Sequence, residues 1–236
     1  MSTAPCEPGT LQPIRLNGVE LLAEASGALL WPEERTLVVA DLHFEKGSSY
    51  ARRGVMLPPY DTRASLDRLE RVIARHAVRR VICLGDSFHD PAAPERLDRA
   101  DAERLLGLTA AIEWLWIAGN HDPAPPATLG GRAIAGEWRE GPLTFRHIAA
   151  AATAPGEISG HYHPKASLDV RGRRLSGRCF VTDERRLVLP AFGAYAGGLD
   201  VFDPALSALF PGGFAVHLIA RERITPLPQA RLAGAF

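Results

Sequence analysis

Short apolar runs alternate with helical patterns over the first half of the chain. Residues 37–40, 81–84 and 114–118 are apolar stretches of the length and composition that buried β-strands favour. Apolar residues recur at helical spacing from Asp61 to His76, which predicts an amphipathic helix, and a weaker helix is expected from Pro94 to Leu108. Strands that alternate with helices predict a parallel sheet, and such sheets bind ligands at the carboxyl ends of their strands.

Strand patterns also precede and follow this unit. Asn17-Gly18 is a strong turn signal between two strand candidates, residues 14–16 and 19–23, and residues 29–31 can add a third. Beyond residue 163, short strand candidates between glycine and proline turns predict a second, more antiparallel sheet. These candidates are residues 168–171, 179–182, 187–192 and 214–219. The expected fold class is therefore α/β, a two-sheet β-sandwich flanked by helices, in one domain spanning residues 1–236.

Two segments between these elements are candidates for substrate contact. Residues 46–62 have little periodicity and contain two glycines and two prolines, which predicts a long loop. Arg52 and Arg53 in this loop can hold a substrate phosphate, or can simply be solvated. Residues 193–198 are a glycine-rich turn in which Tyr195 either contacts substrate or packs.

Side chains that bind metal ions follow the apolar runs. Asp41 and His43 come after the first run, and because residues i and i+2 of a strand point to the same side, their side chains can converge. Gly85 lets the backbone turn so that Asp86 stands at the end of the second run. The remaining candidates are Asn120 after the third run, His147 after the apolar residues 143–145, and the pair His161 and His163. The sequence therefore predicts a metal centre where several strands end.

The donor types narrow the choice of metal. Carboxylate, imidazole and amide donors without a thiolate suit Mn²⁺, Fe²⁺ or Zn²⁺ better than a Mg²⁺ or Ca²⁺ oxygen cage or a structural thiolate zinc site, and we favour Mn²⁺. The chain has no G-x-S-x-G elbow, no phosphate-binding P-loop motif and no obvious Cys/His pair. Covalent catalysis and nucleoside-triphosphate binding therefore have little support.

Charge and composition limit the classes of partner. The 27 basic residues balance the 27 acidic ones, so a DNA substrate requires a local positive patch. The sequence shows no apolar span of membrane length and no leader-like start, so we expect a cytoplasmic protein without membrane contact. Cys6, Cys83 and Cys179 are isolated, which argues against disulfides or a zinc ribbon.

The polar motifs together resemble a known family. Asp41-x-His43, Gly85-Asp86, Gly119-Asn120-His121-Asp122, a lone His147 and Gly160-His161-x-His163 stand in the order and spacing of the calcineurin-like metallophosphoesterases. Within that superfamily, residues 41–62 and 84–90 look most like the ligase-associated DNA-damage-response phosphoesterases and endonucleases, the PdeM group.

The resemblance implies a two-metal phosphodiesterase. It places Asp41, His43, Asp86 and His163 around one divalent ion and Asp86, Asn120, His147 and His161 around the other, with Asp86 bridging. A metal-bound hydroxide is then the nucleophile that attacks a phosphodiester of DNA or of a nucleotide. By the same resemblance, the partners are a DNA ligase and a helicase of a repair set.

Two further residues are expected to serve catalysis. His121 follows the ligand Asn120 and is expected to protonate the leaving group. Many relatives carry an acid three residues after the bridging aspartate to orient this histidine, whereas here that position is His89 and the acid is Asp90. Either of them can take this role, and Asp90 is counted with His121 among the catalytic candidates.

Three other functions are compatible with the same motifs. The first is a small-molecule phosphodiesterase or pyrophosphatase, and the second is a phosphomonoesterase acting on proteins. The third is a non-catalytic protein-binding module, against which the complete ligand set argues. Activity on different phosphate esters distinguishes them.

Overall fold

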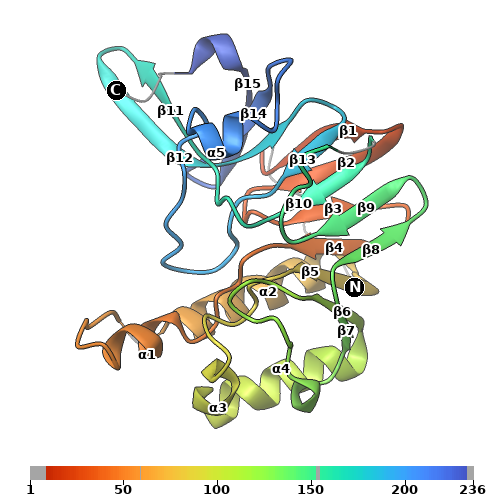
Figure 1. The fold of residues 1–236 in the computed structure, drawn as a ribbon, viewed down its shortest axis with the longest axis vertical. Helices are drawn as coiled ribbons and strands as arrows, with labels where there is room; N and C mark the ends of the chain where they lie inside the picture. The colour runs from red at the N-terminus through yellow and green to blue at the C-terminus, as the bar shows by residue number, and fades with distance from the viewer. Residues whose placement is uncertain (1–8, 59, 153–154, 233–236) are drawn as a thin grey trace.

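Two β-sheets pack face to face in the computed structural model, which describes residues 9–58, 60–152 and 155–232 (Figure 1). The first sheet is antiparallel from β1 to β4 and parallel from β4 to β7. Its strands, in order across the sheet, are β1 (Leu11–Leu16), β2 (Val19–Glu24), β3 (Leu29–Trp31), β4 (Thr36–Val39), β5 (Arg80–Leu84), β6 (Glu113–Ile117) and β7 (Arg132–Ile134). The parallel half is the strand–helix unit that the sequence pattern predicts.

The second sheet is mostly antiparallel, but β10 runs parallel to both β9 and β13. Its strands, in order, are β15 (Arg223–Pro228), β14 (Ala215–Ala220), β12 (Arg173–Thr182), β13 (Arg186–Val188), β10 (Glu157–Ser159), β9 (Leu143–Arg146) and β8 (Glu137–Glu140), with β11 (Lys165–Val170) paired to β12. The predicted two-sheet sandwich flanked by helices is confirmed.

Helices cover the outer faces of the sandwich. α2 (Asp61–His76) and α4 (Arg99–Ala111) pack on the first sheet, below it in Figure 1, and the short α5 (Pro204–Ser207) packs on the second. The remaining short helices are α1 (Lys46–Ala51), α3 (Ala93–Arg96), η1 (Ala127–Leu129) and η2 (Gln229–Arg231).

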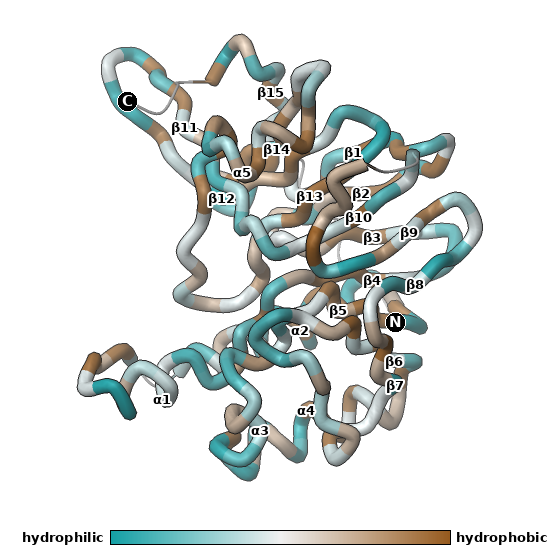
Figure 2. The backbone as a smooth tube through the Cα atoms, in the orientation of Figure 1, coloured by the Kyte–Doolittle hydropathy of each residue, from teal (hydrophilic) through white to brown (hydrophobic). Residues whose placement is uncertain are grey.

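Alternate residues of β4 serve two different cores. Leu37 and Val39 lie in the core with the apolar side of α2, whereas Val38 lies in the core between the two sheets. Because both faces of the strand are covered, its run is continuously apolar. Figure 2 shows the same pattern as brown segments in the central strands β4 to β6, with teal in the connecting loops and in the β8–β9 hairpin.

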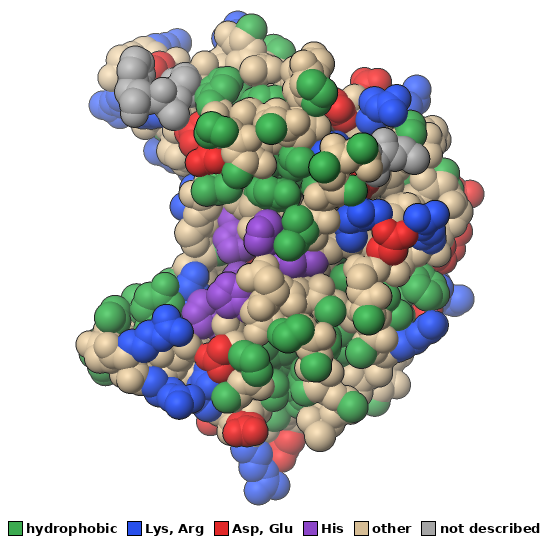
Figure 3. All heavy atoms as spheres, viewed as in Figure 1, with side chains coloured by type: hydrophobic (Ala, Val, Ile, Leu, Met, Phe, Trp, Pro, Cys, Tyr) green, Lys and Arg blue, Asp and Glu red, His purple; other side chains and the backbone are tan. Residues whose placement is uncertain are grey.

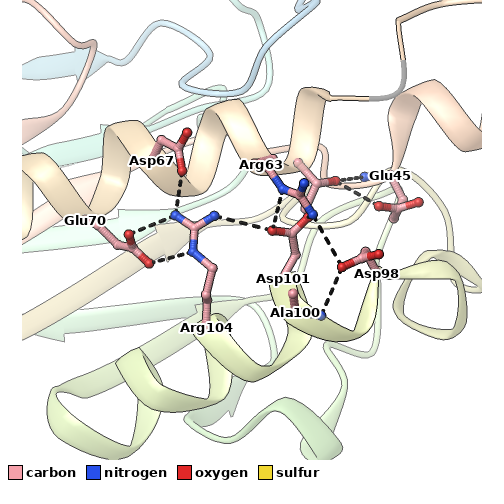
Figure 4. Close-up of polar contacts among 9 residues, drawn as sticks. Glu45, Arg63, Asp67, Glu70, Asp98, Ala100, Asp101 and Arg104 are labelled. Atoms are coloured by element: carbon pink, nitrogen blue, oxygen red, sulfur yellow. Dashed lines mark hydrogen bonds and ion pairs between the residues drawn. The ribbon is translucent and has the colours of Figure 1, made fainter.

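Ion pairs join α2 to α4 on the outside of the molecule (Figure 4). Arg104 on α4 bonds Glu70 on α2 at 2.8 Å and Asp101 at 3.3 Å. Arg63 on α2 reaches Asp101 at 3.2 Å and Asp98 at 3.4 Å, and the Asp98 side chain also caps α4. Asp101 is buried whereas its arginine partners are partly exposed, and together these pairs link α2 to α4 beneath the parallel strands.

Two sequence-based predictions of local structure are wrong. Residues 46–51 form α1 rather than part of a loop. The sequence shows no apolar periodicity there, but the Asp61 side chain accepts a hydrogen bond from the amide of Gly47 at 3.1 Å and supports the start of this helix. The helix expected from Pro94 to Leu108 is two helices, since the backbone at Leu97 (φ −54°, ψ 132°) is extended. The sequence pattern also missed the short strands β7, β8, β10 and β15, whose residues carry little period-two alternation.

Within the described residues, Cys83 and Cys179 are buried free thiols, as the sequence predicts, while Cys6 lies outside them. None of the helices described here combines the length and apolarity that crossing a bilayer requires.

Candidate metal centre

The predicted ligands lie on loops that meet at one edge of the sandwich. Asp41, Asp86 and Asn120 follow β4, β5 and β6, whose carboxyl ends are adjacent because these strands are parallel. His147 follows β9, and His161 and His163 follow β10 of the second sheet. Figure 3 shows the histidine side chains gathered in the hollow between the β11–β12 hairpin and α1. Both sheets therefore contribute to the site.

The backbone at this edge is unusual for residues other than glycine. Five predicted ligands have positive φ angles: Asp41 (54°), His43 (45°), Asp86 (48°), His161 (73°) and His163 (47°). Left-handed backbone at non-glycine residues is uncommon and clusters at functional sites. The sequence predicted that Asp41 and His43 converge because alternate residues of a strand share a side, but both lie beyond the end of β4. Their side chains converge through the left-handed backbone instead.

Asp41, His43 and His163 form one candidate ligand group. One ligating atom from each lies within 4.8 Å of the other two. Nε2 of His163 is 3.3 Å from Nε2 of His43 and 3.3 Å from Oδ1 of Asp41. The Asp41 carboxylate is buried, and its Oδ1 accepts no hydrogen bond from any described residue. Three donors thus face a common point.

Asp86, His147 and His161 form a second group, also within 4.8 Å of one another. Nε2 of His147 lies 3.4 Å from Oδ2 of Asp86, 3.2 Å from Nδ1 of His161 and 2.9 Å from Oδ1 of the predicted ligand Asn120. Nδ1 of His147 donates to the carbonyl of Leu84 at 2.8 Å, which directs Nε2 towards the group. All seven predicted ligands are therefore brought together in two adjacent sets.

Two glycines allow the strand ends to approach this closely. A Cβ added to Gly85 would lie 2.5 Å from Nδ1 of His147, and one added to Gly119 would lie 2.2 Å from the backbone nitrogen of Asp86. Gly85 also has φ +78°, a conformation that other residues rarely adopt. Any larger residue at these positions pushes the ligand loops apart.

The donor set fits divalent cations. In both groups two imidazole nitrogens face each other at hydrogen-bond distance. A single proton between them would be bound to one nitrogen only, whereas a metal cation can accept the lone pairs of both. Burial lowers the pKa of His43 to about 3, so its imidazole is neutral, as metal ligation requires. Burial alone would raise the pKa of Asp86, but the hydrogen bond and charge of His147, the backbone amide of His121 and the charge of His43 together outweigh it and lower the pKa to about 2. Bound divalent ions would supply Lewis acidity towards a phosphoryl oxygen and activate water at neutral pH.

His121 lies beside the predicted ligands and contacts His89, one of the two partners that the sequence left open. Its Nδ1 donates to the backbone carbonyl of His89 at 2.7 Å, which leaves Nε2 as the nitrogen free for a reacting group. The carboxylate of Asp90 instead accepts hydrogen bonds from Nη1 and Nη2 of Arg96, at 2.9 and 2.7 Å. Of the two alternatives, His89 therefore orients His121, through its backbone carbonyl rather than its side chain, while the Asp90 side chain pairs with Arg96.

His89 also takes part in a third cluster. His43, His89 and His121 each place a ring nitrogen within 4.8 Å of the others, and their ring centroids are 5.1 to 5.4 Å apart. The cluster contains no carboxylate and shares His43 with the first group, so it extends the centre already described.

Asp122 has a structural role that the sequence argument did not assign. Its buried carboxylate accepts from the amides of Ser87 and Phe88 through Oδ2, at 2.8 and 3.1 Å, and from Gly119 through Oδ1 at 3.1 Å. It therefore ties the loop carrying Asp86 to the loop carrying Asn120. An acid next to His121 at a strand end was the available signal, but only the fold shows which amides it accepts from.

The predicted substrate contacts lie on two separate loops, one after α1 and one after β13. Arg52 and Arg53 are exposed just after α1, and no described carboxylate pairs with them. Tyr195 is 42% exposed in the loop after β13 and has a positive φ of 58°.

Fold and site together define a phosphoesterase with a divalent-metal centre. The profile of the calcineurin-like phosphoesterase family matches residues 34–184, and the chain belongs to this family. Among solved structures, the chain resembles the nuclease MPE of Pseudomonas putida, with a TM-score of 0.71 and 31% identity over 92% of this chain and 100% of that one.

A second solved structure, Yfce, a phosphoesterase from E. coli, has a TM-score of 0.42 and 12% identity over 82% of this chain and 98% of its own. Comparison with curated proteins gives no match. The chain is a metal-dependent phosphoesterase, a hydrolase of phosphate ester bonds.

Proposed function

We propose that this phosphoesterase uses two divalent ions, with Mn²⁺ favoured, to hydrolyse phosphodiesters of nucleic acid, acting as a DNA endonuclease. The observation that carries the proposal is the pair of adjacent ligand groups, Asp41–His43–His163 and Asp86–His147–His161. The amide of His161 in the second group donates to Oδ2 of Asp41 in the first at 2.9 Å, so the two groups are held side by side. Two adjacent metal sites suit in-line displacement at phosphorus.

The similarity to a nuclease supports nucleic acid as the substrate class. At 31% identity over nearly the whole of both chains, MPE of Pseudomonas putida shares the full fold with this protein. The absence of net charge means that DNA is bound by a local set of cations beside the centre and not by an overall field. Membership of the PdeM group, and with it a DNA ligase and a helicase as partners in repair, is part of the same proposal.

The chain's own residues have distinct parts in this reaction. The seven predicted ligands would hold the ions, Asp122 holds the two central loops together, and His121 would present Nε2 to the departing oxygen. The Asp86 backbone is fixed in turn, since its carbonyl accepts from the amide of His43 at 2.9 Å. Preorganised ligands of this kind need little rearrangement on metal binding.

A substrate panel tests the proposal. Purified protein is stripped with chelator, reconstituted separately with Mn²⁺, Fe²⁺ and Zn²⁺, and assayed on bis-p-nitrophenyl phosphate, p-nitrophenyl phosphate, 2′,3′-cyclic nucleotides, and single- and double-stranded circular DNA. We expect no activity without metal, diester hydrolysis with Mn²⁺, and cleavage of circular DNA, which only an endonuclease can open. Activity confined to the monoester or the cyclic nucleotides would replace DNA with the smaller substrate. Activity unaffected by chelator, in protein without metal by elemental analysis, would exclude the two-metal mechanism.

A further inference from the structure

A cavity of about 300 Å³ opens beside the metal-ligand residue His163. It lies between α2, the start of β11, and the loop after β13 that carries Tyr195. Three cations line it from separate elements: Arg68 on α2, Lys165 on β11 and Arg178 on β12. The cavity therefore joins a strongly basic wall to one end of the metal centre.

These three cations have no carboxylate partner among the described residues: no described ion pair includes Arg68, Lys165 or Arg178. Glu24 is the acid whose charge reaches both arginines, but its Oε1 bonds Arg75 at 2.6 Å and its Oε2 accepts from the amide of Ser26 at 2.7 Å. No described carboxylate therefore forms an ion pair with this wall, and Glu24 acts on its two arginines only through its charge.

Main-chain oxygens hold the two arginines in place. Arg68 donates to the carbonyl of Phe192 at 2.6 Å and lies over its ring, 5.3 Å from the centroid. Arg178 donates to the carbonyls of Ala191 and Ser26, at 3.0 and 2.6 Å. Neutral acceptors orient a guanidinium without cancelling its charge, which leaves it available to a bound anion.

Holding these charges together is unfavourable in the empty cavity. Burial, and the neighbouring charge of Arg68, lower the pKa of Arg178 to about 10, and burial also lowers the pKa of Arg68. Both side chains stay cationic at neutral pH, and an anion between them relieves the repulsion. Lys46 on α1 adds to the positive field, since its charge interacts with that of Lys165.

The cavity on the opposite side of the metal centre is different. It has a volume of about 430 Å³ and is lined by Asn120 and His147 together with Arg146 and Glu137. There Arg146 pairs with Glu137, so its charge is compensated. The two cavities therefore differ in charge, because the cations that line the one beside His163 have no ion-paired carboxylate among the described residues.

We propose that the cavity lined by Arg68, Lys165 and Arg178 binds a second phosphate group of the substrate, next to the phosphodiester hydrolysed at the metal centre. This inference rests on the proposed function and makes it more specific: the preferred substrate carries at least two phosphates, as a strand or an end-phosphorylated oligonucleotide does. Tyr195, exposed at the rim of the same cavity, supplies a ring for the base attached to that phosphate.

Binding to metal-free protein tests the cavity without turnover. Chelator-treated protein is titrated with thymidine 5′-monophosphate and with uncharged thymidine by calorimetry. We expect the monophosphate to bind better than thymidine. The double variant Arg68→Ala with Lys165→Ala should bind the monophosphate about tenfold more weakly or worse, whereas Lys165→Arg, which keeps the positive charge, should retain part of the affinity. The matched control, Arg15→Ala with Arg99→Ala, removes two exposed charges outside the cavity and should bind as the wild type does. Equal affinity in the cavity variant and the wild type would overturn the proposal.

Turnover of Mn²⁺-loaded protein then tests the use of the second phosphate. The dinucleotide TpT is compared with pTpT and TpTp, and the ratio of kcat/KM with and without the end phosphate is measured. In the wild type we expect one of the two ends to raise this ratio to about ten or more, and in Arg68→Ala with Lys165→Ala the ratio should fall towards one. A wild-type ratio near one, with bis-p-nitrophenyl phosphate still hydrolysed, overturns the subsite and leaves the proposed function standing. If no diester is hydrolysed, the proposed function is overturned. The binding titration then decides by itself whether the cavity binds a phosphate group.

Discussion

Asp122 accepts a hydrogen bond from the backbone amide of Ser87 at 2.8 Å, and this contact joins the loop after β6 to the loop after β5. The second oxygen of the same carboxylate accepts from Gly119. One buried side chain thus sets the distance between the loops that carry Asn120 and Asp86, without facing either ligand group itself.

Replacing Asp122 with Ala should therefore weaken metal binding indirectly. The change leaves buried amides unpaired, which should lower the free energy of unfolding by about 1 to 3 kcal/mol. Loss of the support behind the ligands should lower Mn²⁺ affinity by about 10- to 100-fold. Denaturant titration and metal titration measure the two effects, and Asp169→Ala, on the exposed end of β11, is the control. Unchanged metal affinity in a destabilised variant would limit Asp122 to a role in folding.

Asp86→Asn should abolish activity and reduce metal occupancy. The carboxylate of Asp86 accepts from the amide of His121 through Oδ1 and faces His147 through Oδ2, and an uncharged amide in its place cannot balance the charge of two dications. Elemental analysis alongside the diester assay checks this result, with Asp169→Asn as the control. Full activity in Asp86→Asn would remove this residue from the metal centre.

His121→Ala should affect substrates according to their leaving group. A sugar alkoxide needs a proton to depart, whereas p-nitrophenolate leaves readily without one, so activity on a nucleotide diester should fall by about 10² to 10⁴ and activity on the nitrophenyl ester much less. Metal content is measured in the same samples. Equal losses on both substrates at full metal content would exclude proton donation by His121, and loss of metal would show that it supports the ligands.

Arg52→Ala with Arg53→Ala should weaken DNA binding more than it slows hydrolysis of a small diester. Both side chains are exposed just after α1, where a long substrate can reach them and a small one need not. If each contacts one phosphate, the slope of log affinity against log salt should fall by about two. Equal effects on DNA and on the small diester would make these arginines part of the catalytic centre or of the fold.

His217 should make folding stability depend on pH below neutrality. It is buried in β14, and burial lowers its pKa to about 4, whereas an unfolded histidine titrates near 6.5. Between these values the unfolded chain binds the extra proton, so stability is fully present above about pH 6.5 and falls, by about 1 to 3 kcal/mol in total, as the pH approaches 4. Denaturation of wild type and His217→Phe across this range isolates the effect by difference. An identical pH dependence in the two proteins would contradict this assignment.

The sequence alone determined the central strands and the donor types. The runs at residues 37–40, 81–84 and 114–118 are apolar because both faces of β4, β5 and β6 are covered, and this property is visible without the fold. Four of the predicted ligands follow these runs, namely Asp41, His43, Asp86 and Asn120, so their order and spacing were also readable, and a continuous periodic pattern located α2. Local patterns of this kind depend only on the neighbouring residues.

Only the tertiary structure decided which distant groups meet. The carbonyl of His89 as the partner of His121 could not be predicted, because a backbone oxygen carries no sequence signal. The left-handed backbone at Asp41 and His43 likewise depends on contacts with the loop after β5, such as the bond from the amide of Asp41 to the carbonyl of Gly85 at 3.3 Å. The basic cavity brings together Arg68, Lys165 and Arg178 from three elements far apart in the chain, and their charges act together only because the two sheets and α2 pack around one edge.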